Sequence, residues 1–157
     1  MGVAGDTVFR PEDFFDGRTE GAAVVRDLFG RIVRRCEMVT VGQRRSAYGA
    51  LEFDETFTYD DGEVDRWRWV MTRGRDGGYV ASESLAGAGI AGSHVGDDYV
   101  LAFRRPTRAG RRQVRARFVT RFTLLAPGMA LKTVRVSLFG LPAAELVGVH
   151  RKAGAAA

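Results

Sequence analysis

The chain has 157 residues, of which 45% are hydrophobic and 27% are charged, and this is the size and composition of one globular domain. Its one cysteine, Cys36, excludes an intrachain disulfide. The start, MGVAGDTVFRPEDFF, lacks the pattern of a signal peptide, and no segment approaches the roughly 20 apolar residues of a membrane-spanning helix. We therefore expect a cytoplasmic, single-domain protein over residues 1–157 with no transmembrane segment, and a homodimer is compatible with the sequence.

The net charge of +5 raises the question of an anionic partner. Basic side chains between residues 114 and 124 alternate with apolar ones, as on the solvated outside of a strand. A second basic cluster falls in a segment with Pro106 and Gly110, which is typical of a turn. It consists of Arg104, Arg105, Arg108, Arg111 and Arg112. We interpret both clusters as solvated surface and loop and expect no nucleic-acid partner; RNA, a phospholipid surface or an acidic ligand is the alternative.

In chain order, a short helical turn is expected at Pro11 to Phe15, with Phe14 and Phe15 plugging one end of the fold. Strands follow almost without interruption, separated by turns at the many glycines. They are expected near residues 19–26, 31–41, 47–59, 64–73, 78–85, 88–94, 98–104, 112–125, 129–138 and 145–152. The tail at 153–157 is expected to be disordered.

About ten consecutive strands with short connections predict an all-β fold, an antiparallel up-and-down barrel. Closure is favoured because it removes the exposed edges of an open sheet. A β-sandwich is the competing fold, but it would need longer crossover connections. The small residues of segment 86–96 predict a close approach of backbone or ligand.

The segment from Leu51 to Trp69 is the most informative one. It reads as a hairpin in which one strand face is aromatic and apolar except for Glu55, and Asp60-Asp61-Gly62 forms the turn. A carboxylate on a buried face is costly unless it is paired, hydrogen-bonded or protonated. Glu55 therefore indicates either a buried polar network or a ligand site.

Aromatic side chains are placed so that they line the barrel lumen or fill it. A barrel of eight strands is just wide enough to be packed by side chains, whereas ten strands leave room for a ligand. Both interpretations stay open. The expected ligand-lining residues are Phe53, Phe57, Tyr59, Trp67, Trp69, Tyr79, Phe103, Phe118 and Phe122.

Three polar residues are candidates for proton transfer: Glu55, Tyr59 and Glu83, which shares a face with Tyr79. A carboxylate in apolar surroundings can act as a general acid or base or anchor a ligand. The structural alternative is a satisfied carboxylate that is bonded to a neighbouring Arg or Tyr. A pair of interior carboxylates fits either acid/base work or a hydrogen-bond network across the barrel.

Neither metal nor cofactor is expected. His94 and His150 are far apart in the sequence and have no ligand spacing, which disfavours zinc, and a haem ligand would need more than a lone histidine. Cys36 lies on a strand without a catalytic signature and is interpreted as a small buried residue.

Several motifs occur in a fixed order along residues 13–152. They are Asp13-Phe14-Phe15-Asp16-Gly17, Phe29-Gly30-x-Ile32-Val33-x-Arg35, Leu51-x-x-x-Glu55-x-Phe57-x-Tyr59-x-Asp61-Gly62, Trp69, Tyr79, Gly87 to Gly92, and Phe139-Gly140. With them the chain resembles an uncharacterised bacterial family, catalogued as a domain of unknown function and assigned to the lipocalin-like (calycin) barrels. The resemblance implies the barrel and brings no activity.

The chain departs from that family at several positions. It lacks the family's usual lipoprotein signal, and Trp67, Leu138 and His150 stand where the family tends to have Arg, Lys and an aromatic residue. These changes predict a more apolar lumen.

Two functions remain open. The first is binding of a small apolar or aromatic molecule inside the barrel. The second is a cofactor-independent cyclase or isomerase, in which the same lumen holds a flexible apolar substrate in its reactive conformer and Glu55 transfers a proton. Hydrolytic and covalent chemistry is disfavoured because no nucleophile-base-orienter set is present.

Overall fold

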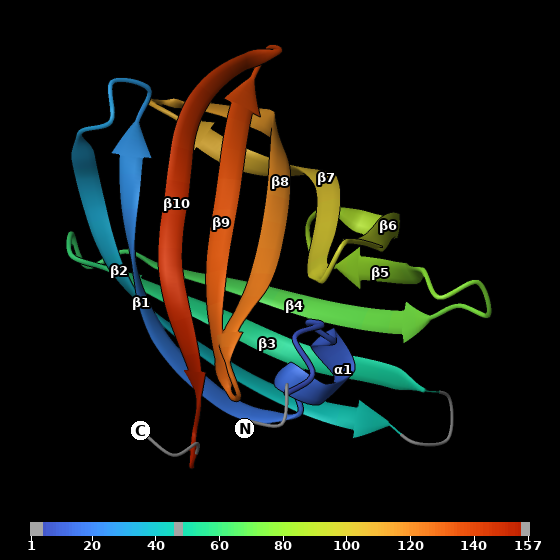
Figure 1. Ribbon diagram of the computed structural model, residues 1–157. Coiled ribbons are helices and arrows are strands. Elements are labelled where there is room, and N and C mark those ends of the chain that lie inside the picture. The colour runs from blue at the N-terminus through green and yellow to red at the C-terminus, as the bar shows by residue number, and fades with distance from the viewer. Residues whose placement is uncertain (1–4, 46–48, 155–157) are drawn as a thin grey trace.

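A computed structural model describes residues 5–45 and 49–154, and within them the chain forms ten strands and one short helix (Figure 1). The elements are α1 (Pro11–Phe14), β1 (Gly17–Asp27), β2 (Ile32–Arg45), β3 (Ala50–Tyr59), β4 (Val64–Arg73), β5 (Tyr79–Glu83), β6 (Gly87–Val95), β7 (Asp98–Ala109), β8 (Arg112–Ala126), β9 (Met129–Leu138) and β10 (Leu141–Lys152). Every expected strand is present, and β4 and β9 have the predicted bounds.

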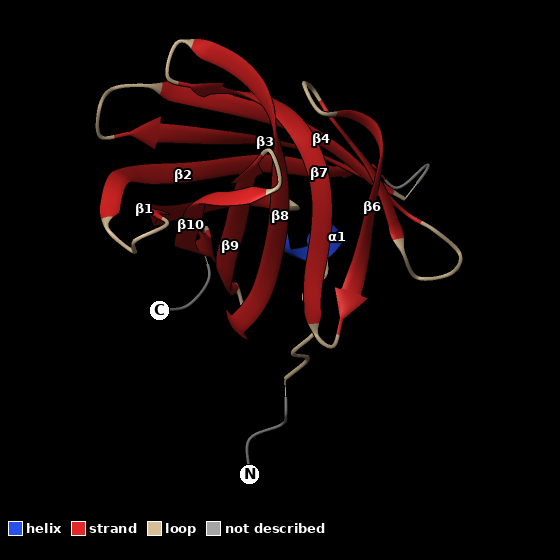
Figure 2. Ribbon diagram, turned by 90° about the horizontal axis from the view of Figure 1, so that it is seen from above, coloured by secondary structure: helices blue, strands red, loops and turns tan. Residues whose placement is uncertain are grey.

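The strands form a closed antiparallel barrel, as predicted, in which each strand pairs with the next along the chain. The ring closes between β1 and β10, where Thr19 lies opposite Lys152 and Asp27 opposite Ala144. Figure 2, which is seen from above the view of Figure 1, shows the strands curving around into one sheet. The sandwich alternative is excluded because the ten strands form one closed ring rather than two separate sheets.

Strand β7 corrects the sequence prediction, which ended it at Arg104 and placed Arg105 in a solvated turn. The strand continues through Pro106 to Ala109, and its ladder with β8 is unbroken. Pro106 is tolerated because β6 pairs only with the first part of β7, so one edge of β7 needs no N–H donor at this point. As a result, Arg105 points into the barrel and is 4% exposed.

Side chains alternate between the interior and the outside along each strand, and this alternation builds the core. In β8, Ala116, Phe118 and Thr120 are buried while Arg115 and Arg117 are exposed, as the sequence predicted. The close approach expected in segment 86–96 occurs at Gly92, where an added Cβ would overlap the ring of Tyr99.

An N-terminal plug closes one end of the barrel, as expected for the Pro11–Phe15 turn. Figure 1 shows α1 close to β3, near the lower ends of β8 and β9. Phe9 and Phe15 are fully buried there; Phe15 stacks on Phe53 with ring centroids 4.6 Å apart, and Phe9 stacks on Phe122 at 5.0 Å. The plug thus fills the barrel end with aromatic surface.

Polar contacts fasten the plug to several strands. The Phe9 N–H donates to the Asp97 carbonyl at 2.9 Å, and Asp13 pairs with Arg44 at 3.1 Å. Glu12, which is 7% exposed, accepts a 2.8 Å hydrogen bond from the Tyr79 hydroxyl. These contacts leave the opposite end of the barrel as the route to the interior.

No helix in the described residues is long and apolar enough to cross a membrane. The predictions made for residues 47–48 of the third strand and for residues 155–157 of the tail lie outside the described residues.

The plug predicts a strong dependence of stability on Phe15. Phe15→Ala is expected to lower the free energy of unfolding by about 3–5 kcal/mol, because it leaves a cavity between stacked rings. Phe29→Ala is the matched control, since Phe29 is 76% exposed and its loss should change stability little. Urea denaturation measures both; equal effects would contradict the role of the plug.

Candidate functional site

A cavity of about 270 Å³ occupies the barrel interior above the plug. It extends from Phe53, Met71 and Phe122 in the middle of the barrel to Arg34 and Leu138 near the open end. The chain direction explains this layering, because β3 and β9 both run from the plugged end toward the open end. Within the described residues, the interior is therefore not filled by side chains alone.

Aromatic rings form much of the cavity wall. Trp67 lies 5.4 Å from Phe118 and 5.8 Å from Phe103 between ring centroids, both nearly edge to face. Phe103 and Phe118 stack on each other at 5.4 Å. Edge-to-face and offset contacts of this kind fix the rings in place, so the cavity has a preformed apolar wall.

A buried ion pair crosses the lumen between strands that are not neighbours. The Lys132 ammonium on β9 donates to the Glu55 carboxylate on β3 at 2.6 Å, and Trp69 Nε1 donates to the other carboxylate oxygen at 2.9 Å. Glu55 is 4% exposed and Lys132 is 3% exposed. The ammonium also lies 4.8 Å from the centre of the Phe57 ring. Pairing and hydrogen bonds offset the cost of burying both charges.

A second buried pair lies closer to the open end. The Arg105 guanidinium donates to the Glu83 carboxylate at 3.1 Å and stacks on Trp67 at 3.8 Å from the ring centre. Glu83 also accepts hydrogen bonds from the Ser84 hydroxyl and from the N–H groups of Leu85 and Ala86. Burial alone would raise the pKa of Glu83, but these hydrogen bonds hold it below its usual value.

Most of the predicted ligand-lining residues do line the cavity, and two predicted site residues do not. The cavity wall includes Phe53, Glu55, Phe57, Tyr59, Trp67, Trp69, Phe103, Phe118 and Phe122. Tyr79 instead lies at the plugged end, bonded to Glu12. Glu83 faces Arg105 and the β5–β6 turn rather than the cavity, so its contacts are those of a structural carboxylate.

Tyr59 stands at the mouth of the cavity. The guanidinium of Arg34 lies 3.6 Å from the centre of its ring and also pairs with Asp61 and Glu63. Burial raises the pKa of the Tyr59 phenol, which therefore stays protonated at neutral pH. Tyr59 can donate a hydrogen bond to a molecule that enters the lumen.

The sequence prediction missed both lumen cations, Lys132 and Arg105. The sequence did contain a signal for both, namely the period-two pattern of the strands. Lys132 falls on the same strand face as buried Ala130 and Val134, and Arg105 falls on the same face as buried Leu101 and Phe103. A basic residue in an inward-facing position indicates an interior partner as clearly as Glu55 does.

His150 lies outside the cavity, fully buried between the plug and β1. Its Nδ1 is 3.4 Å from the Thr19 hydroxyl, which is also bonded to Thr40, and its Nε2 has no partner in the described part of the chain. Burial, together with the charge of Lys132, lowers the pKa of His150 to about 3. The imidazole is therefore neutral in the folded protein at physiological pH.

A family model described as "Protein of unknown function (DUF3833)" matches residues 4–152. The chain is a member of the DUF3833 family. This confirms the resemblance drawn from the sequence motifs to a family of unknown function. No curated protein matches the chain.

Two solved structures share the fold of this DUF3833 protein. An S-type phycobiliprotein lyase from Guillardia theta superposes with a TM-score of 0.63 at 10% identity, covering 92% of both chains. A redesigned β-barrel superposes with a TM-score of 0.50 at 12% identity, covering 94% of this chain and 98% of the other. At these identities the likeness shows the lipocalin-like barrel fold and no shared activity.

The ion pair predicts a strong coupling between Glu55 and Lys132. Lys132→Met leaves the carboxylate buried with only the Trp69 donor, and we expect a loss of about 3–5 kcal/mol in the free energy of unfolding. Combining it with Glu55→Gln should restore most of that loss. Arg68→Met, which breaks an exposed pair with Asp54 on the outside of the same hairpin, is the control and should change stability little. If the changes in unfolding free energy of the two single variants simply added up in the double variant, the coupling would be contradicted.

His150 predicts a pH dependence of stability. Its folded pKa lies below its unfolded value of 6.5, so its contribution is complete above pH 6.5 and is lost as the pH falls toward 3. This loss changes the free energy of unfolding by at most about 1.4 kcal/mol per pH unit. Urea denaturation at successive pH values measures it, and the His150→Gln variant should lack this part of the pH dependence. His94→Gln is the matched control. If both variants reduced the pH dependence of stability equally, the assignment to His150 would be contradicted.

Proposed function

We propose that this DUF3833 protein binds a compact, mainly apolar or aromatic molecule in the barrel lumen, with a polar group held at the Glu55–Lys132 pair. The observation that carries the proposal is the cavity of about 270 Å³, which combines an aromatic wall with one buried ion pair. Small-molecule sites share this composition, in which an apolar lining supplies affinity and a few fixed polar groups supply orientation. The volume lies just below the usual range of about 300–1,000 Å³ and favours a compact ligand.

The ion pair has hydrogen-bonding capacity left for such a ligand. An ammonium has three donors and a carboxylate has about four acceptor sites. The contacts with Trp69 and with each other use only part of this capacity. A ligand hydroxyl, carbonyl or amine can therefore bond to the pair without displacing either partner.

A cofactor-independent cyclase or isomerase is the second candidate function. The same pair favours it, because Glu55 can accept a proton from a substrate and the adjacent Lys132 ammonium can donate one, with their heavy atoms 2.6 Å apart. The aromatic wall would hold the substrate in its reactive conformer. Native mass spectrometry of protein from its own host gives the mass of a retained compound, and chromatography of the extracted compound separates the two functions, since isomers share one mass: a single compound supports a binder, and a pair of isomers supports an enzyme.

Ligand binding is testable with anilinonaphthalenesulfonate, a small aromatic dye. We expect saturable dye fluorescence with the folded protein and a loss of about 1–3 kcal/mol in binding free energy in Trp67→Ala, the scale of one large apolar side chain. Trp69→Ala should act in the same direction. Leu125→Ala, at an exposed position near the plugged end, is the control. Unchanged affinity in both tryptophan variants would show that the rings are only core.

Glu55→Gln distinguishes the role of the carboxylate in that assay. If Glu55 anchors the ligand, the variant stays folded by circular dichroism and loses affinity for ligands whose polar group donates a hydrogen bond. A variant with altered stability and unchanged affinity would assign Glu55 a structural role.

A further inference from the structure

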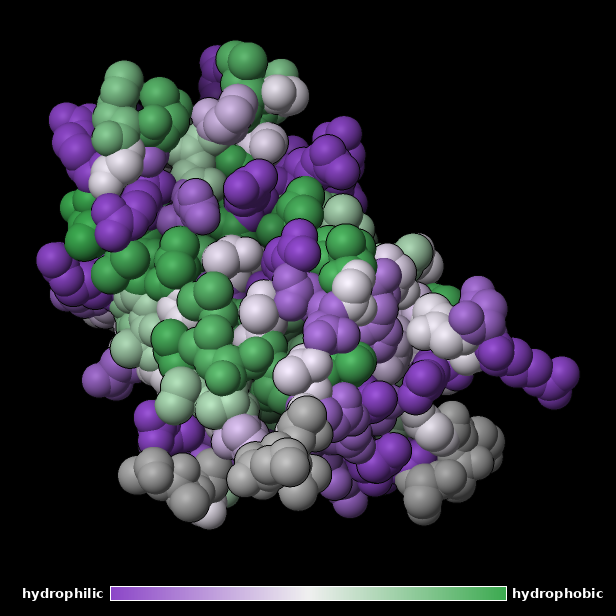
Figure 3. All heavy atoms as spheres, in the orientation of Figure 1, coloured by the Kyte–Doolittle hydropathy of each residue, from purple (hydrophilic) through white to green (hydrophobic). Residues whose placement is uncertain are grey.

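Large apolar side chains are exposed on two neighbouring turns at the open end of the barrel. Leu28 and Phe29 lie on the β1–β2 turn and are 62% and 76% exposed, and Phe139 and Leu141 lie at the β9–β10 turn and are 88% and 69% exposed. The turns are adjacent because β1 pairs with β10. Figure 3 shows hydrophobic atoms at the tips of both hairpins, at the top of the view. We call these four residues the apolar rim.

The backbone conformation at Phe139 is strained, and its side chain adds no burial to the barrel that would offset this strain. Phe139 has φ of 52°, and Gly140 follows with φ of 79°, in a two-residue turn closed by the Leu138–Leu141 pair. Turns of this type favour Asn, Asp or Gly at the first position, since other side chains are strained in the left-handed region. A large aromatic side chain that is both strained and exposed indicates a contact beyond the chain itself.

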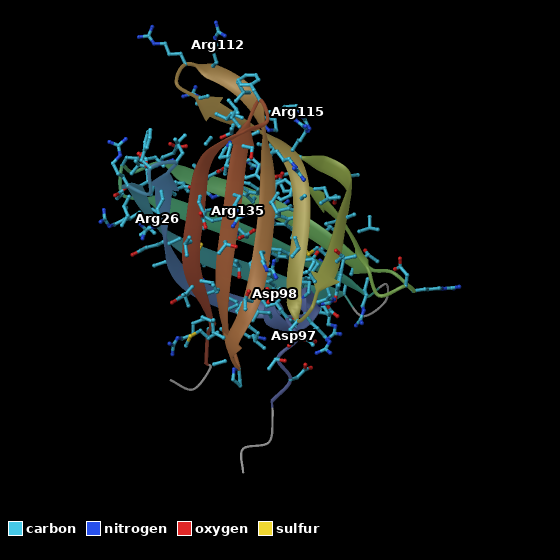
Figure 4. The ribbon with its side chains drawn as sticks, turned by 45° about the horizontal axis from the view of Figure 1, so that its top comes forward. Arg26, Asp97, Asp98, Arg112, Arg115 and Arg135 are labelled. Carbon is cyan, nitrogen blue, oxygen red and sulfur yellow. The ribbon has the colours of Figure 1, made fainter. Side chains whose placement is uncertain are left out.

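A strongly basic hairpin lies at the same end. Residues 104–117 hold seven arginines and no carboxylate, and all the arginines except Arg105 are exposed. None of the six exposed ones forms an ion pair with the residues that the structure describes. Figure 4 shows Arg112 and Arg115 projecting from the β7–β8 hairpin beyond the body of the barrel. We call residues 104–117 the arginine hairpin.

The carboxylates at the open end do not neutralise the positive charge of the arginine hairpin. Asp27 pairs with Arg31, and Asp61 and Glu63 pair with Arg34. Asp65 accepts a hydrogen bond from Trp67 and lies 3.8 Å from the Arg105 guanidinium, so these carboxylates already have partners other than the six exposed arginines. The labelled Asp97 and Asp98 lie at the opposite end of the barrel in Figure 4. The open end therefore combines unpaired positive charge with exposed apolar side chains.

We propose that the open end of the barrel docks on an anionic lipid bilayer. The apolar rim enters the headgroup layer, and the arginine hairpin lies against the lipid phosphates, to which guanidinium groups bind in a bidentate manner. The apolar residues sit on separate turn tips rather than on one flat patch, and a fluid surface accommodates such tips. In this orientation the cavity mouth faces the membrane, although docking does not require a bound ligand.

The test measures binding of the purified chain to vesicles by flotation. Vesicles of phosphatidylcholine alone are compared with an equal mixture of phosphatidylcholine and phosphatidylglycerol at about 0.1 M salt, where surface charges act over roughly 10 Å. We expect binding only to the anionic vesicles and its loss at high salt. Equal binding to both vesicle types, or binding to neither, would overturn the proposal.

Matched charge variants locate the contact on the molecule. Arg111→Gln with Arg112→Gln should weaken binding by roughly tenfold or more, since each basic residue near an anionic surface contributes a several-fold factor. Arg75→Gln with Arg151→Gln removes the same charge from exposed positions at the plugged end and should leave binding nearly unchanged. Equal losses in the two pairs would show unspecific attraction and overturn the proposed face.

The apolar rim is tested separately. Phe29→Ser with Phe139→Ser should weaken vesicle binding severalfold, whereas Leu125→Ser, at a residue 51% exposed near the plugged end, should not. Phe139→Trp should add emission that shifts to the blue on anionic vesicles and is quenched by brominated lipid. An unshifted emission in bound protein, or binding to heparin without binding to vesicles, would assign the arginine hairpin to a soluble polyanion and overturn membrane docking.

Discussion

Closure of the sheet between β1 and β10 is the constraint on which the rest of the structure depends. It pairs the first strand with the last, so neither is left as the edge of an open sheet. A closed ring of this size encloses more space than inward-facing side chains fill. The N-terminal plug takes up part of that space with Phe9, Phe14 and Phe15, and the cavity is what remains.

The charges in the lumen follow from the same geometry. Strands β3 and β9 are distant in the ring, yet the narrow interior brings Glu55 and Lys132 within 2.6 Å. Replacing such a pair by apolar residues is often neutral or stabilising, so the pair is weak evidence for stability as such. What distinguishes it is its placement, because both partners of this buried pair lie in the cavity wall. In the Arg105–Glu83 pair, by contrast, only Arg105 lines the cavity, and Glu83 is bonded to the β5–β6 turn.

The two ends of the barrel have opposite characters. The plugged end is fastened by hydrogen bonds and ion pairs that join the N-terminal segment to several strands. At the open end, turns present Phe29 and Phe139 to solvent beside an arginine hairpin without carboxylates. Because the cavity reaches only the open end, access to the lumen and the surface chemistry of that end are physically connected.

The sequence by itself determined the strands, the plug and the burial of Glu55, because period-two alternation and glycine turns are local properties of the chain. It also placed most of the aromatic lining. Only the tertiary structure decided that Lys132 is the partner of Glu55, since the two are 77 residues apart and meet across a closed ring. It likewise moved Tyr79 and Glu83 away from the cavity and turned Arg105 inward. Pairings across a lumen depend on strand number and register around the whole barrel, and no local pattern encodes them.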